Sequence, residues 1–119
     1  MELVITAIGD KGDLKSERIG MKVLKDCELK FYLLFKTEKI DGGGFYNRSK
    51  ESYWFYPKKV KAGDKVVVYS KRGIDKSEEK SDGTTVHFIY WGLTEPIFTN
   101  ENKIVVLSQI NDWTMSNKI

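Results

Sequence analysis

Residues 53–70 read YWFYPKKVKAGDKVVVYS, and they hold the most informative signal for the fold in this chain. It begins with aromatic residues of high β-propensity and ends in the valine-rich run 66–69. Between them, Pro57 ends the first strand because proline lacks the amide hydrogen that a strand ladder needs. The sequence KAGD at 61–64 then forms a turn. This order predicts a loop that delivers the chain into an internal strand of a β-sandwich.

Strand patterns recur on both sides of this stretch. In residues 17–23, Ile19, Met21 and Val23 alternate with polar positions, which is typical of a half-buried strand. The run FYLLF at 31–35 predicts a strand that is buried on both faces or lies at a sheet centre. The full set of expected strands is 3–8, 17–23, 31–35, 65–70, 85–91 and 103–107, with a hairpin over 45–55. No amphipathic helix is expected, so the sequence predicts an all-β sandwich.

The connections are polar and rich in turn residues. Residues 39–44, KIDGGG, must be a turn or loop, and residues 71–84 are expected to be the longest exposed loop. Of the aromatic residues between these loops, Phe45, Trp54 and Phe55 are expected to fill the core. Trp113 and Ile119 fall in a tail for which the pattern gives no element.

Composition is typical of one globular domain spanning residues 1–119. Hydrophobic residues make up 40% and charged residues 31%, and no apolar run approaches the ~20 residues that span a bilayer. The N-terminus MELVITAIGD lacks the features of a secretory signal, and the single cysteine cannot form an internal disulfide, so we expect a cytoplasmic protein without membrane contact. The formal charge of +3 indicates a mixed, solvated surface.

Few residues can perform chemistry. His87 is the only histidine and lies in a strand pattern, which favours a structural or surface role. Cys27 lies between Asp26 and Glu28, whose charges disfavour a thiolate. The acidic residues at 75–82 have no regular calcium-loop spacing, and the glycines at 42–44 precede no phosphate-binding helix. We therefore expect no enzymatic activity, no metal and no cofactor.

An aromatic and basic mixture around residues 45–65 is the best candidate ligand surface. Aromatic rings that stack bases, together with lysines that neutralise phosphates, are typical of single-strand-binding β-domains. The candidate binding residues are Tyr46, Arg48, Tyr53, Tyr56, Lys58, Lys59, Lys61, Lys71 and Arg72, with Lys50 and Trp54 in the same region. Nucleic-acid binding is therefore one hypothesis for the function.

The order of these pieces resembles a lamin tail domain over most of the chain. The similar pieces are 17–23, the sequence DCEL at 26–29, YLL at 32–34, 53–70, 87–92 with its aromatic-Trp-Gly ending, 97–100 and 103–107. The resemblance implies an immunoglobulin-like antiparallel β-sandwich of about seven to nine strands. It names no catalytic residues that could be carried over to this chain.

We therefore expect a protein-interaction or scaffold module without catalysis, whose partner is another protein. Nucleic acid is the alternative partner, and the oligomeric state is open. The 71–84 loop is a candidate recognition segment, and deleting residues 74–82 is expected to leave the fold intact. The edges of a sandwich offer strand addition as a second mode of binding.

Overall fold

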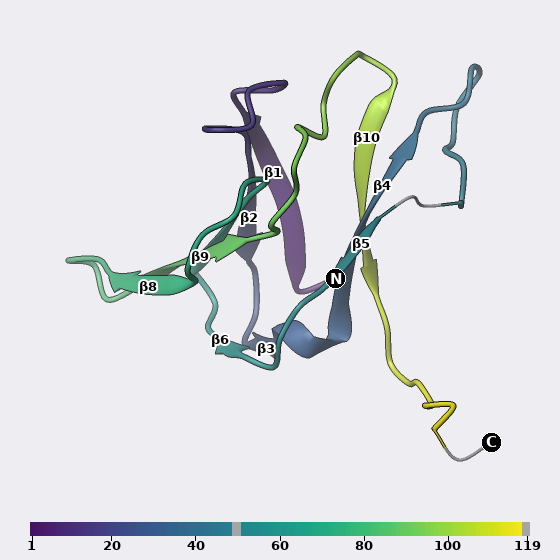
Figure 1. The fold of residues 1–119 in the computed structure, drawn as a ribbon. Coiled ribbons are helices and arrows are strands. Elements are labelled where there is room, and N and C mark those ends of the chain that lie inside the picture. The colour runs from purple at the N-terminus through teal and green to yellow at the C-terminus, as the bar shows by residue number, and fades with distance from the viewer. Residues whose placement is uncertain (49–50, 118–119) are drawn as a thin grey trace.

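The structure is a computed structural model that describes residues 1–48 and 51–117. Within these residues the chain forms ten strands and one 3-10 helix, and no α-helix (Figure 1). The all-β prediction is confirmed. No helix in the described ranges is long and apolar enough to cross a bilayer.

Two larger sheets and a two-stranded ribbon make up the fold. The five-stranded sheet runs in the order β1 (Leu3–Gly9), β2 (Arg18–Val23), β7 (Lys65–Tyr69), β9 (Thr85–Tyr90), β8 (Lys76–Glu79). The three-stranded sheet runs in the order β10 (Lys103–Gln109), β4 (Tyr32–Glu38), β5 (Ser52–Trp54). The ribbon pairs β3 (Cys27–Glu28) with β6 (Lys59–Val60), and the 3-10 helix η1 (Leu29–Phe31) leads from β3 into β4.

The core lies between the two larger sheets. On β2, Ile19, Met21 and Val23 are fully buried, as their alternation predicts, while Lys22 is exposed. They belong to one apolar cluster with residues of the other sheet, among them Leu34 of β4. The central position of β4 in its sheet confirms the expectation for the FYLLF run, although Leu33 and Phe35 on its outer side are only half-buried.

Two details of the predicted sandwich are wrong. The described residues form ten strands rather than seven to nine, because β3, β6 and β8 are too short or too polar to show as strand patterns. In addition, β7 and β9 pair in parallel, with Val67 opposite Phe88, so the sheet is not wholly antiparallel. The cause is the intervening strand: the chain leaves β7, reverses in β8 at the sheet edge, and reverses again into β9 between them.

The 71–84 segment is therefore not simply a loop. Residues 76–79 form β8, which pairs antiparallel with β9 and has four exposed residues. A deletion of residues 74–82 would remove this strand from the sheet edge, and the expectation that the fold survives it stays a prediction.

The predicted hairpin over 45–55 is also wrong. Strand β5 pairs with β4, with Tyr53 opposite Leu34, and Phe45 makes only an isolated bridge to Lys39. Phe55 is buried in the core, but Phe45 and Trp54 are 41% and 45% exposed. Trp54 faces outward because its neighbour Tyr53 takes the inward position in the period of two.

Candidate functional site

The predicted binding residues do not form one surface. Tyr53, Tyr56 and Lys58 line a single cavity beside β8. The others are divided between three places: Lys59 and Lys61 line a second cavity near β3, Tyr46 and Arg48 line a shallow depression beside Glu38, and Lys71 lies over the ring of Tyr69 with Arg72 next to it in the chain. Lys50 and Ile119 lie outside the described residues. The aromatic and basic mixture of the sequence is thus scattered over the fold.

The cavity beside β8, called here the His87 cavity, has a volume of about 500 Å³. Its lining combines residues from the 53–58 segment with residues from β8 and β9, the polar ones including Tyr53, Tyr56, Lys58, Ser77 and His87. Pro57 breaks the chain out of the sheet at this point, which carries Tyr56 and Lys58 to the cavity rim. Tyr56 is 74% exposed there.

A chain of three side chains leads from this cavity into the protein. Ser77 Oγ lies 2.9 Å from His87 Nδ1, and His87 Nε2 lies 3.0 Å from Asp64 Oδ2. His87 and Asp64 are both 6% exposed, whereas Ser77 is exposed on β8. The histidine that the sequence predicts to be structural or at the surface is thus buried, with both ring nitrogens in hydrogen bonds.

Asp64 is fixed by the KAGD turn that the sequence predicts. Gly63 adopts the left-handed conformation with φ 93°, and the Asp64 carboxylate accepts hydrogen bonds from the amides of Lys61 at 3.1 Å and Thr85 at 3.0 Å. Burial alone would raise the pKa of Asp64, but the hydrogen bonds from His87 and the two amides outweigh it and hold the pKa below its usual value of 3.8. Asp64 is therefore ionised at neutral pH.

Tyr53 supplies a protonated phenol to the same cavity. Burial raises its pKa to about 12, and the neighbouring Asp75 and Tyr56 add to the shift, since negative charge nearby opposes a phenolate. Tyr53 also packs edge-on against Phe55, with ring centroids 5.2 Å apart. The ring therefore belongs to the core on one side and to the cavity on the other.

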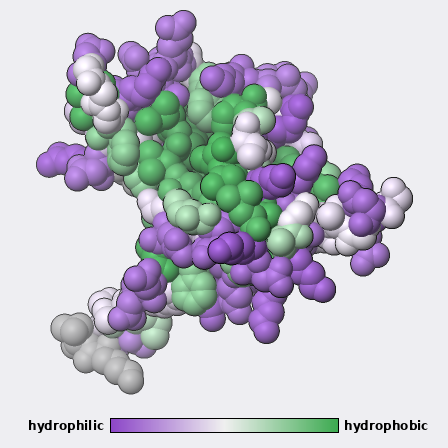
Figure 2. All heavy atoms as spheres, turned by 180° about the vertical axis from the view of Figure 1, so that it is seen from behind, coloured by the Kyte–Doolittle hydropathy of each residue, from purple (hydrophilic) through white to green (hydrophobic). Residues whose placement is uncertain are grey.

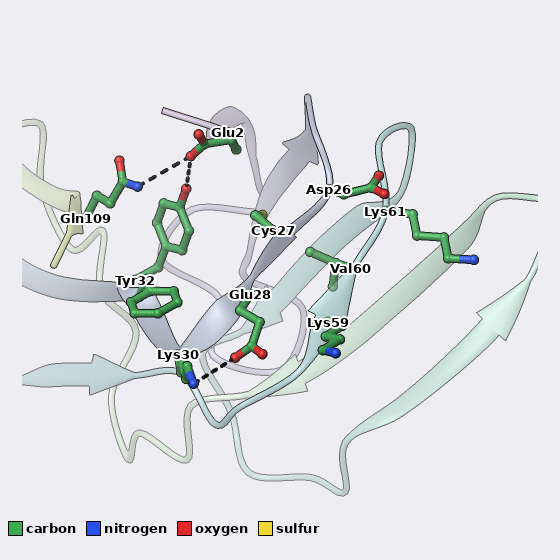
Figure 3. A pocket seen from close by; sticks show the side chains of 11 residues that line it. Glu2, Asp26, Cys27, Glu28, Lys30, Tyr32, Lys59, Val60, Lys61 and Gln109 are labelled. Atoms are coloured by element: carbon green, nitrogen blue, oxygen red, sulfur yellow. Dashed lines mark hydrogen bonds and ion pairs between the residues drawn. The ribbon is translucent and has the colours of Figure 1, made fainter. Parts of the chain in front are cut away.

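A second cavity of about 690 Å³ lies near β3 (Figure 3). Its lining mixes both signs of charge: the Tyr32 hydroxyl donates to Glu2 Oε2 at 2.9 Å, and Lys30 Nζ lies 3.3 Å from Glu28 Oε2. Burial raises the pKa of Cys27, and the Glu2 carboxylate adds to the shift. Among the described residues, no group of three histidine, cysteine, aspartate or glutamate side chains is placed to hold a metal ion. The Cys27 thiol is thus held in its protonated form, and it belongs to no metal-binding cluster among the described residues.

A third feature is the edge formed by β10. This strand pairs with β4 on one side, and no other strand among the described residues pairs with its second side. The amide of Ile110 donates to Phe31 O, and the amide of Lys39 donates to Asn102 O, so the even-numbered residues of β10 bond to β4. In an antiparallel ladder, the alternate residues Val105 and Leu107 then point their N–H and C=O groups away from β4. We call this row of groups the β10 edge.

The β10 edge itself carries apolar side chains. Val105 and Leu107 are half-buried and pack against the core. Seen from the side opposite to Figure 1, apolar atoms gather at the centre of the molecule within a polar surround (Figure 2). The β10 edge therefore joins unpaired backbone groups to incompletely covered apolar surface.

The outer side of the three-stranded sheet is also apolar, and we call it the aromatic face. Its residues are Leu33, Phe35, Trp54 and Val106, with Phe45 and Trp113 laid over them. Trp113 lies edge-on to Trp54 with ring centroids 4.9 Å apart, so the tail that showed no pattern in the sequence packs on this face. Trp113 and Trp54 are nevertheless 42% and 45% exposed.

Asp64, Ser77 and the β10 edge were not among the predicted site residues. The only local signal for Asp64 was the turn sequence, which says nothing of a contact with a histidine 23 positions later. Ser77 lay in a segment expected to be a loop, and the row of backbone groups on β10 depends on pairing, which the sequence does not record.

Comparison with known proteins identifies no family for this chain. No protein family, no curated protein and no solved structure matches the chain.

Proposed function

We propose that this chain is a protein-interaction module that binds an extended segment of another protein by strand addition at the β10 edge. The proposal is carried by the second side of β10, where the outward amide and carbonyl groups of Val105 and Leu107 pair with no strand of residues 1–48 and 51–117, and where the side chains of both residues are apolar and half-buried. A partner strand would satisfy these groups and cover this surface at once.

The form of the sheet edges supports β10 as the docking strand. Edge strands of native proteins are usually blunted by charges, bulges or short length. The ladder of β1 with β2 has a shift between Ile5 and Ala7, and β8 has four residues of which three are charged. By contrast β10 is seven residues long, pairs in unbroken register with β4, and carries an apolar run at 104–107. An edge of this kind is prone to pair with another chain.

The chemistry of the edge defines the partner. Side chains of an added strand that point inward would pack beside Val105 and Leu107, so they are expected to be apolar. Those that point outward would lie beside Val106 on the aromatic face, which favours aromatic or β-branched residues. The expected partner is an extended segment without proline at its pairing positions.

We infer that the two larger sheets form an immunoglobulin-like sandwich and that the chain is a relative of lamin tail domains. The order of strand, short turn and aromatic strand in 17–35 and the KAGD turn before β7 support this relation. Nucleic-acid binding has weaker support, because its predicted residues lie in four separate places.

The test uses proline to remove one outward amide. The variant Val105→Pro loses an N–H that takes no part in the ladder with β4, so the sheet should survive while strand addition fails. Glu79→Pro is the matched control: the Lys80 amide bonds across to Thr84, so the Glu79 amide likewise points away from β9, at a different sheet edge. Tagged wild-type protein and both variants are used to capture partners from native extract with nuclease present.

The captured partner is then purified and mixed with the wild-type protein, and hydrogen exchange is measured. Binding at the β10 edge should slow exchange at Val105 and Leu107, whereas Val106 is already protected by β4. Wild type and Glu79→Pro should retain the partner and Val105→Pro should lose it. A partner held equally by Val105→Pro contradicts the proposal, and loss of all bound material on nuclease treatment favours the nucleic-acid hypothesis.

A further inference from the structure

The ionised carboxylate of Asp64 determines which nitrogen of His87 carries the proton, and so the direction of the hydrogen bond to Ser77. Asp64 is ionised and can only accept hydrogen bonds, so the proton between it and the histidine belongs to His87 Nε2. In neutral imidazole the other nitrogen, Nδ1, then carries a lone pair. The hydrogen bond of 2.9 Å to Ser77 therefore runs from the serine hydroxyl to the histidine.

This is the arrangement that activates a serine. A nucleophile needs a base within hydrogen-bond reach, and the base needs a third group that fixes its tautomer and orientation. Here the carboxylate binds Nε2 and the serine binds Nδ1. Either ring nitrogen can serve as the base while the other binds the carboxylate, because in neutral imidazole one nitrogen donates a hydrogen bond and the other accepts one.

The nucleophile is also accessible. Ser77 is exposed on the edge strand β8, and both Ser77 and His87 line the His87 cavity of about 500 Å³. Leu29, Pro57 and the rings of Tyr53 and Tyr56 give this cavity an apolar and aromatic wall. Lys58 and Lys76 also line it and are the cations available to a developing negative charge, although the carboxyl group of Asp75 lines it as well. A small ester with an aromatic alcohol suits such walls.

We propose that Ser77 is a nucleophile for acyl transfer, with His87 as its general base and Asp64 as the positioning residue. Ser77 Oγ forms a bond to the acyl carbon of the ester while its proton passes to His87 Nδ1. The bond from the acyl carbon to the alcohol oxygen then breaks, and that oxygen takes the proton from His87. Water then gives a proton to His87 Nδ1 and attacks the acyl carbon; the bond from that carbon to Ser77 Oγ breaks, Oγ takes the proton back from His87, and the carboxylic acid leaves. No oxidant, reductant or metal enters the balance.

This inference does not depend on strand addition at β10, which lies in the other large sheet. It departs from the expectation that the chain has no enzymatic activity, which rested on the single histidine and on the lack of a recognisable catalytic set in the sequence. The three groups are separated by 10 and 23 positions and meet only through the pairing of β8 with β9 and the turn at Asp64.

The test is covalent labelling with a fluorophosphonate probe, together with hydrolysis of p-nitrophenyl acetate. Peptide mass spectrometry should locate the adduct on Ser77. Ser77→Ala should abolish labelling, and His87→Gln should slow it roughly a hundredfold, the order of general-base contributions. Ser52→Ala is the matched control, since Ser52 is an exposed serine on the edge strand β5 and should leave both readouts unchanged.

A second measurement covers the case in which His87→Gln fails to fold. In a Cys27→Ser background, Ser77→Cys and Ser52→Cys are compared for alkylation by iodoacetamide at pH 7, and the thiol next to His87 should react at least about tenfold faster. Equal alkylation rates, an adduct on another residue, or hydrolysis that persists in Ser77→Ala would overturn the proposal. Val105→Pro should label like the wild type, which separates this inference from the β10 proposal.

Discussion

The buried carboxylate of Glu17 accepts a hydrogen bond of 2.7 Å from the amide of Ile97, a residue 80 positions later in the chain. Glu17 has no exposed surface, and its two oxygens also accept from the Ser70 hydroxyl and from the amides of Gly12 and Phe98. One side chain thus ties the start of β2 to the end of β7 and to the segment between β9 and β10. A carboxylate matches this position because it only accepts hydrogen bonds and each of its partners here is a donor.

The variant Glu17→Gln should therefore destabilise the fold by about 2–3 kcal/mol, the cost of leaving buried donors without an acceptor. A glutamine keeps the size of the side chain but replaces one acceptor oxygen with an NH₂ group, which would face donors. Chemical denaturation at pH 7 gives the free energy of unfolding. Glu101→Gln, on the exposed turn before β10, controls for the loss of one negative charge and should change stability by less than about 0.5 kcal/mol.

The sequence predicts the strands that have a period of two or an apolar run, and misses those defined by their partners. Ile19, Met21 and Val23 place β2 correctly because burial on one face leaves a local pattern. Strand β8 leaves none, since all four of its residues are exposed. The parallel pairing of β7 with β9 follows from that missed strand, and so could not be predicted either.

For the candidate sites too, the sequence predicts what is close together along the chain and misses what depends on contacts between distant strands. Tyr53, Tyr56 and Lys58 were predicted as binding residues and do share a cavity, because Pro57 keeps them together locally. Lys71 and Arg72 were grouped with them by composition alone and lie elsewhere. The Asp64 to Ser77 relation and the β10 edge depend on contacts between distant strands, for which a single sequence carries no direct signal.

A pair of prolines tests the register of β10 in the free protein. Val106 donates its amide to β4, whereas the amide of Val105 points away. Val106→Pro should therefore cost more stability than Val105→Pro, by about 1–3 kcal/mol, because it removes a ladder hydrogen bond and leaves the facing acceptor on β4 without its donor. Thermal or urea unfolding of the two variants measures the difference. Greater destabilisation by Val105→Pro than by Val106→Pro would show that the register is shifted by one residue, and equal destabilisation would contradict the assignment of the Val105 amide to the unpaired side.

The low pKa of Asp64 predicts how stability depends on pH. A carboxyl with a folded-state pKa below 3.8 stabilises the protein above that pH, and this contribution is lost as the pH falls through the folded-state pKa. Asp64→Asn should therefore be less stable than the wild type at pH 7, by about 1–3 kcal/mol from its weakened hydrogen bonds. In urea titrations, the difference in free energy of unfolding between the wild type and Asp64→Asn should become smaller below pH 3.8.

Asp41→Asn, on the exposed loop at 40–44, is the control for the general effect of removing one acidic group. The free energy of unfolding of Asp41→Asn should differ little from that of the wild type at neutral pH. If the gap between wild type and Asp64→Asn stays constant from pH 7 down to pH 3, the carboxylate of Asp64 does not gain from its contacts with His87 and the two amides.

The environment of Cys27 predicts a slow thiol. Burial raises its pKa above the usual 9.0, and the Glu2 carboxylate adds to this because it opposes a second negative charge nearby. Since the thiolate is the reacting form, alkylation by iodoacetamide at pH 8 should be slower than that of an exposed cysteine. Ser81→Cys in a Cys27→Ser background provides such a cysteine, because Ser81 is exposed after β8. Glu2→Gln should speed alkylation of Cys27, since it removes the opposing charge, and an unchanged rate in that variant would assign the slow reaction to burial alone.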